Sequence, residues 1–178
     1  MANDPLAGVD PDGQRILYSS PAAKADFLNA VSQASASAQT RIQWVDRSPV
    51  IFKIGFKADE TTINIDEASK VNTKYVRGVT HPDSKINGQV DIDYIKGDKI
   101  AAIHEVAGHG YQIAVFDQKL REGRILKTTP SGTAIDEFEA SRADLHNFLH
   151  YEKDAFNISG QTFGKNDEQY YTNQFQGK

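Results

Sequence analysis

The stretch "AAIHEVAGHGYQ" (residues 101–112) holds two of the chain's five histidines, with a glutamate directly after the first. Metal-binding helices commonly carry two histidines four positions apart, whereas His104 and His109 are five apart. Each residue of a straight α-helix turns by about 100°, so side chains five apart diverge by about 140° and cannot reach one ion. A local π-type turn removes this divergence, with Gly108 as the inserted residue. The stretch therefore predicts a helix that is widened at a functional site.

Two histidines need a third protein ligand to hold a catalytic divalent ion, and the chain has no cysteine to supply one. The later segment "AIDEFEAS" (134–141) is rich in carboxylates. We expect Glu137 to be this ligand, because it shares a helix face with short side chains that allow close packing, and Glu139 is the reserve. A set of two histidines and a glutamate favours zinc. The alternative is two unrelated histidines on one helix, with Glu137 a solvated acid at a helix start.

Glu105 is suited to act as a general base that accepts a proton from water at the metal. Asp144 is placed to orient a histidine ligand from outside the ligand set. His146 and His150 lie four positions apart and could form a metal-binding pair of their own, but an ordinary partly buried or surface pair is the favoured interpretation. A donor for a developing oxyanion is also needed, and the sequence leaves its identity open among Tyr111, His146, His150, Tyr151, Tyr170 and Tyr171.

Composition limits the remaining classes of function. At 178 residues the chain has the length of one domain, and its apolar fraction of 39% is enough for a core. The net charge of −4 and the absence of a basic block argue against nucleic-acid binding. No apolar run approaches the length of a membrane span, and the N-terminus lacks the pattern of a signal peptide.

Strand patterns occupy the middle of the chain. "RIQWV" (41–45) and "VIFKIGF" (50–56) alternate and are rich in β-branched and aromatic residues, which predicts a hairpin or two neighbouring strands. "TTINID" (61–66) predicts a third strand and "KYVRGV" (74–79) a short one. "GQVDIDYI" (88–95) alternates most clearly, and we expect this strand to line the edge of a cleft and pair with an extended substrate.

Helix patterns flank these strands. Ser20 followed by proline has the form of a helix start, and apolar residues follow at helical spacing. Asp98 can cap a helix over about 99–120, which carries both histidines of the opening stretch. Residues 134–153 predict a second long helix, and 154–178 carry weak structural signals. The sequence therefore predicts an α+β domain in which a small mixed or antiparallel sheet packs on an active-site helix and a ligand-bearing helix.

Residues 1–15 are rich in Asp, Pro and Gly and predict a lead-in to a domain over 16–178.

Two family resemblances bear on function. "HEVAGHG" resembles the His-Glu-x-x-Gly-His motif of dipeptidyl peptidase III, in which an extra residue separates two zinc histidines. "DEFEAS" is similar to that family's Glu-Glu-x-Arg-Ala-acid motif, with Glu137 at the ligand position, but it lacks the arginine and the final acid. The resemblance covers these two segments alone, so release of dipeptides does not carry over.

The segment "GVDPDGQRILYSS" (8–20) resembles the Asp-Pro-x-Gly junction at which Rhs polymorphic toxins release a C-terminal toxin domain. The layout that follows resembles the zincin-like effector peptidases of bacterial toxins. This resemblance implies a secreted zinc metallopeptidase that is delivered from a bacterium into a target cell, where it hydrolyses a peptide bond of a protein substrate. It also implies a cognate immunity protein in the producing cell.

Two alternatives stay open from the residues themselves. The same cluster could serve a non-catalytic metal-binding or interaction domain, in which the metal is structural. It could also serve a metal-dependent amidohydrolase that acts on a non-peptide substrate, since the chemistry is the same. Zinc deaminases fit less well, because they use cysteine ligands.

Overall fold

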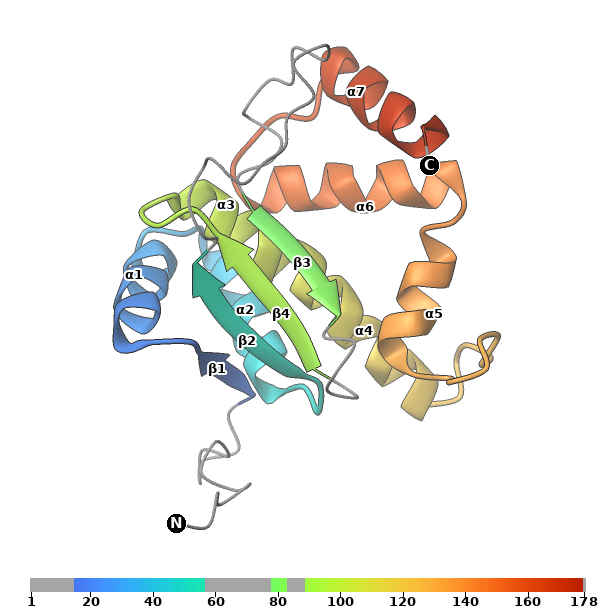
Figure 1. Ribbon diagram of the computed structural model, residues 1–178, viewed down its shortest axis with the longest axis horizontal. Helices are drawn as coiled ribbons and strands as arrows, with labels where there is room; N and C mark the ends of the chain where they lie inside the picture. The colour runs from blue at the N-terminus through green and yellow to red at the C-terminus, as the bar shows by residue number, and fades with distance from the viewer. Residues whose placement is uncertain (1–14, 57–77, 83–88, 178) are drawn as a thin grey trace.

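A four-stranded mixed sheet lies at the centre of the computed structural model, which describes residues 15–56, 78–82 and 89–177 (Figure 1). The first three strands in sheet order are parallel to one another, and the last is antiparallel to its neighbour. The α+β class and the mixed alternative for the predicted sheet are confirmed, whereas a wholly antiparallel sheet is excluded. The strands, in sheet order, are β1 (Ile16–Tyr18), β2 (Ile51–Phe56), β4 (Gln89–Tyr94) and β3 (Gly78–Pro82).

The parallel pairing of β1 and β2 requires a crossover, which is formed by α1 (Pro21–Ser32) and α2 (Ala36–Arg47). The predicted strand "RIQWV" is therefore wrong, because these residues lie in α2. Ile42 and Val45 are buried three positions apart, which is helical spacing. The Ser35 side chain accepts a hydrogen bond from the backbone at the start of α2 and caps the helix.

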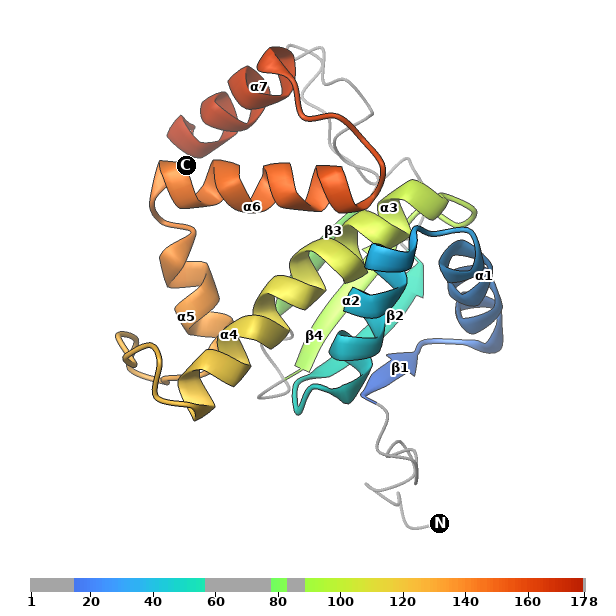
Figure 2. The ribbon, with the colours of Figure 1, turned by 180° about the vertical axis from the view of Figure 1, so that it is seen from behind.

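The predicted helix from 99 to about 120 is confirmed as one continuous rod with three parts. These are α3 (Lys99–Ile103), the π-helix η3 (His104–Gly110) and α4 (Tyr111–Arg121). Asp98 caps it as expected, by accepting a hydrogen bond from the Ala101 amide at 3.1 Å. Figure 2 shows this rod and α2 side by side across one face of the sheet.

The core lies between that face of the sheet and these helices. The strand side chains Phe52, Ile54 and Ile92 and the helix side chain Val106 are all completely buried. Burial of this kind stabilises a fold by about 25 cal/mol per Å² of apolar surface. Because η3 is part of this core, the position of both histidines is fixed by the main packing interface of the protein.

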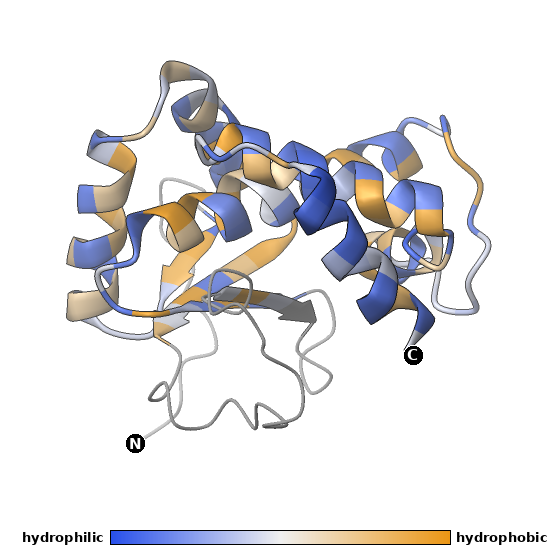
Figure 3. Cartoon of the chain, turned by 90° about the horizontal axis from the view of Figure 1, so that it is seen from above, coloured by the Kyte–Doolittle hydropathy of each residue, from blue (hydrophilic) through white to orange (hydrophobic). Residues whose placement is uncertain are grey.

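The predicted single helix over 134–153 is wrong, because the chain turns sharply between α5 (Ala134–Ser141) and α6 (Leu145–Ile158). Asp144 accepts a hydrogen bond from the Asn147 amide at 3.0 Å and is the N-cap of α6. The tail also contains a helix, α7 (Lys165–Gln176), where only weak signals were found. This helix packs against α6, and in Figure 3 the label C marks its end.

Several predictions fall on residues outside the described ranges. These are the strand over 61–66, most of the strand over 74–79, and the lead-in with its Asp-Pro-x-Gly segment. Within the described ranges, no helix combines the length and apolar character needed to cross a membrane.

Candidate metal centre

The structure brings His104 and His109 of η3 together with Glu152 of α6. One ligand atom from each lies within 4.8 Å of the other two, and all three residues are buried. Oε2 of Glu152 is 3.5 Å from Nε2 of His109 and 3.9 Å from Nε2 of His104. Atoms that bind zinc tetrahedrally at about 2.1 Å are about 3.4 Å apart. The three side chains therefore fit a single ion of this size with small adjustments.

The π-helix is what allows the two histidines to converge. In a helix with hydrogen bonds five residues apart, positions i and i+5 return to nearly the same face. The imidazole rings of His104 and His109 are accordingly 5.0 Å apart between centroids and meet edge to face. The π-type turn predicted from the spacing is confirmed.

Gly108 determines how closely α6 approaches η3. A Cβ atom at this position would lie 2.5 Å from Cβ and 2.8 Å from Cα of Ala155, which is impossibly close. Ala155 lies three positions after Glu152 on α6, so the two side chains share a helix face. The glycine therefore has a second function besides its place in the π-turn, because it lets Glu152 reach the histidines.

Gly108→Ala is expected to destabilise the fold by about 1–3 kcal/mol, because α6 must move outward. The matched control is Gly110→Ala, since a Cβ there meets Ile92 and Phe52 at 3.4 and 3.6 Å, which are ordinary contacts. We expect the control to be neutral, or stabilising by up to about 1 kcal/mol. Thermal unfolding of both metal-free variants measures the difference. Equal melting temperatures would contradict the role given to Gly108.

Glu152 is held from its other side by Arg142. The guanidinium Nη2 donates to Oε1 of Glu152 at 3.0 Å, which leaves Oε2 to face the histidines. Burial acts to raise the pKa of Glu152, but His109, Arg142 and His104 outweigh it and bring the pKa to about 2. The carboxylate is therefore ionised at neutral pH, as a metal ligand must be. The Tyr171 hydroxyl of α7 also donates a hydrogen bond to Glu152.

The two histidines differ in their proton affinity. Burial lowers the pKa of His104, and the neighbouring His109 lowers it further, against the effect of Glu105. Burial also acts to lower the pKa of His109, but the facing carboxylate of Glu152 outweighs it and the net shift is upward. Both directions follow from the geometry, since His109 lies nearer to Glu152.

The side chain of Glu105 extends from η3 to β3. Its Oε2 accepts a hydrogen bond from the Thr80 hydroxyl at 2.7 Å. A Cβ on Gly78 would lie 2.6 Å from Cγ of Glu105, so only glycine leaves room for this side chain against the strand. β3 thus holds the carboxylate through Thr80.

This arrangement corrects the cleft edge predicted at 89–95. Strand β4 is paired on both sides, with β2 and with β3, so its backbone groups are already used. In the described part of the sheet the outer strand next to η3 is β3.

The carboxylates predicted as third ligands lie elsewhere. Glu137 is buried, and its oxygens accept hydrogen bonds from the backbone and hydroxyl groups of Thr128 and Thr129 at 2.6 to 2.8 Å. These hydrogen bonds, led by the Thr128 hydroxyl, lower the pKa of Glu137 to about 2. Glu139 is exposed and pairs with Arg142 at 3.4 Å. The physical reason is that α5 packs on α4, so Glu137 secures the loop that joins them.

Among the candidate oxyanion donors, Tyr171 contacts Glu152 beside the histidines. Several other predicted site residues lie away from them. Tyr111 faces α2, with its ring 5.8 Å from that of Trp44. Asp144 is an exposed helix cap instead of a partner of a ligand. His146 and His150 are exposed on α6.

Glu152 was missed by the sequence analysis, although its position carries a signal. Phe148, Ala155 and Phe156 are the buried apolar residues of α6, and Glu152 is the charged residue on that same face. A carboxylate on the apolar face of an amphipathic helix is costly unless it is paired. Correct placement of the break before α6 would have exposed this pattern.

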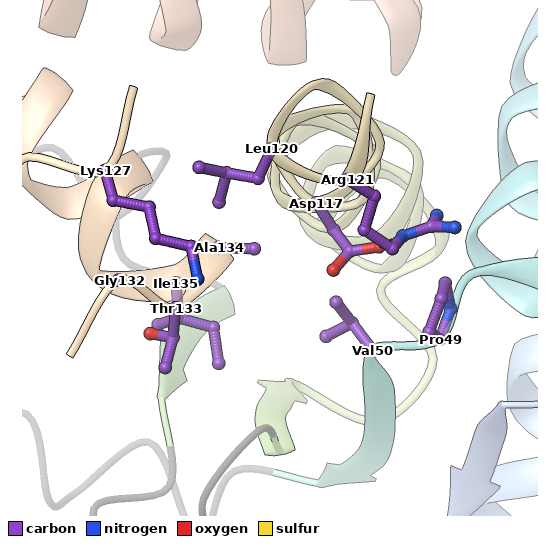
Figure 4. Close-up of a pocket in the computed structure, with 10 residues that line it drawn as sticks. All are labelled: Pro49, Val50, Asp117, Leu120, Arg121, Lys127, Gly132, Thr133, Ala134 and Ile135. Carbon is purple, nitrogen blue, oxygen red and sulfur yellow. The ribbon is translucent and has the colours of Figure 1, made fainter. Parts of the chain in front are cut away.

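A separate pocket of about 320 Å³ opens near the C-terminal end of α4 (Figure 4). Leu120, Val50 and Ile135 form much of its apolar lining, and it contains none of the three candidate ligands. Its charged groups include Arg121 and Asp117, which pair with each other at 2.7 Å. This pocket offers no convergent set of catalytic side chains.

Comparisons of the chain with protein families, with curated proteins and with solved structures find no match. The geometry of this centre is therefore the basis for a proposed function.

Proposed function

We propose that the protein is a zinc-dependent peptidase whose centre consists of His104, His109 and Glu152, with Glu105 as the general base. The observation that carries the proposal is the convergence of three buried ligand residues next to the carboxylate of Glu105, which Thr80 holds in place. Three protein ligands leave one coordination position open, which is typical of catalytic zinc, whereas structural zinc sites usually have four.

A bound zinc ion would lower the pKa of a water molecule and polarise a substrate carbonyl. The chain's own residues would supply the base and hold the ligands in position. Thr80 donates to Oε2 of Glu105 and fixes the position of the carboxylate, which would accept the proton from water. Arg142 neutralises Oε1 of Glu152 and keeps its other oxygen directed at the histidines.

A peptide substrate suits the position of β3. An extended chain can pair with the backbone of an outer strand, and β3 holds Glu105 through Thr80. Pairing there would bring a peptide bond next to the general base. The resemblance to Rhs toxins extends the proposal to delivery into a target cell and to an immunity protein in the producer.

The proposal is tested by incubating the zinc-loaded protein with a mixed peptide library and identifying products by mass spectrometry. We expect cleavage that stops on addition of a chelator and returns with about one equivalent of zinc per chain. Products that form equally well in excess chelator would contradict the metal dependence. Zinc binding without any cleavage of peptides would favour a structural metal or a non-peptide amide substrate.

A further inference from the structure

The buried side chain of Gln112 joins His109 to groups that are not ligands. Its amide nitrogen lies 3.0 Å from the Tyr151 carbonyl oxygen and 3.2 Å from Oδ2 of Asp154. Its amide oxygen lies 3.1 Å from Nδ1 of His109. Because a carbonyl and a carboxylate oxygen can only accept, the NH₂ group of Gln112 must face them, and its oxygen must face the histidine.

The orientation of this amide fixes the tautomer of His109. An amide oxygen accepts, so Nδ1 of His109 carries the hydrogen and donates it to Gln112. Nε2, the nitrogen that faces Glu152, is then the one with a lone pair for a metal. If the Gln112 amide were reversed, its NH₂ group would face Nδ1 and the hydrogen of His109 would move to Nε2. Nε2 would then have no lone pair for a metal.

Asp154, which holds the amide, is held in turn by Arg41 of α2. The two guanidinium nitrogens lie 2.7 and 2.9 Å from the two carboxylate oxygens, which is a bidentate pair. The guanidinium also lies over the Tyr111 ring, 4.6 Å from its centroid. A continuous chain of polar contacts thus runs from α2 through α6 and α4 to the histidine.

We propose that Gln112, Asp154 and Arg41 are positioning residues that set the ring orientation and tautomer of His109, and thereby the metal affinity of the centre. This inference rests on the proposed metal site. Partners of this kind typically change metal affinity by roughly 10–100-fold when removed. A purely structural role would lower the stability of the fold and leave the affinity of the folded protein unchanged.

The test measures dissociation constants for Zn²⁺ and Co²⁺ by competition with a chelator, together with the Co²⁺ absorption spectrum and the melting temperature without metal. Gln112→Met keeps the length of the side chain and removes the acceptor, so we expect the dissociation constant to rise roughly 10–100-fold. Arg41→Met acts two contacts further away and is expected to give a smaller rise, with a changed Co²⁺ spectrum. The control is Arg121→Met, which removes an arginine–aspartate pair on α4 that does not reach the centre, and it is expected to bind as the wild type does.

Wild-type affinity and spectrum in a folded Gln112→Met variant would overturn the inference. If that variant does not fold, the metal affinity and Co²⁺ spectrum of Arg41→Met provide the test, because Arg41 lies partly at the surface and tolerates replacement. Wild-type behaviour of Arg41→Met would then overturn the inference. Failure of the wild-type protein to bind either metal would instead overturn the proposed function.

Discussion

Glu152→Gln is expected to abolish stoichiometric zinc binding. The amide of glutamine has no negative charge, and its oxygen binds metal ions more weakly. Losing a ligand should therefore weaken zinc binding by more than the roughly 100-fold that is typical of losing an outer partner. Arg142 and His109 would also lose the carboxylate that both of them contact. Leaving a buried charge without its partner typically costs about 3–5 kcal/mol, so the metal-free variant should also melt at a lower temperature. Elemental analysis after exchange into metal-free buffer, with one zinc per wild-type chain as the reference, measures the loss.

Glu137→Gln is the matched control, because it makes the same chemical change at another buried glutamate. The glutamine would keep one acceptor oxygen and lose the other, so part of the hydrogen bonding to Thr128 and Thr129 would go. We expect a lower melting temperature and a full complement of zinc. The reverse pattern, with zinc lost in Glu137→Gln and retained in Glu152→Gln, would restore the ligand predicted from the sequence.

The difference between these two glutamates shows which parts of the centre can be read from sequence. The five-residue spacing of His104 and His109 is a local property of one helix, so helical geometry alone predicted the π-turn that the structure contains. The proposed third ligand, Glu152, lies on a helix whose position depends on the contact between Gly108 and Ala155. Nothing in the spacing along the chain encodes that contact.

Errors in the predicted fold have a similar origin. "RIQWV" carries residues that are frequent in strands, but the cap at Ser35 and the burial of Ile42 and Val45 make it helical. Strand "GQVDIDYI" was predicted correctly as an element, whereas its place inside the sheet depends on β2 and β3. For this strand the local pattern identified the element type, whereas tertiary packing decided which strand of the sheet became the edge.

Glu105→Gln is expected to retain zinc and to lose nearly all hydrolytic activity. Glu105 is not among the three converging ligands, so its carboxylate can be replaced without removing a metal contact. Glutamine can still accept the hydrogen bond from Thr80, so the position of the side chain should be preserved. Glutamine cannot act as a base, and loss of general-base catalysis typically lowers kcat by about 100- to 10,000-fold.

Thr80→Val gives a graded comparison for the same step. This variant keeps the carboxylate of Glu105 and removes the hydroxyl that orients it, 2.7 Å away. We expect a reduction in kcat that is clearly smaller than that of Glu105→Gln, with zinc content again unchanged. The measurement is kcat on the best library peptide, alongside zinc content, for both variants. Full activity in zinc-loaded Glu105→Gln would show that this carboxylate is not the base, even if the metal itself is required. A loss of zinc in that variant would mean that Glu105 belongs to the ligand set, and the roles of the two glutamates beside the histidines would have to be exchanged.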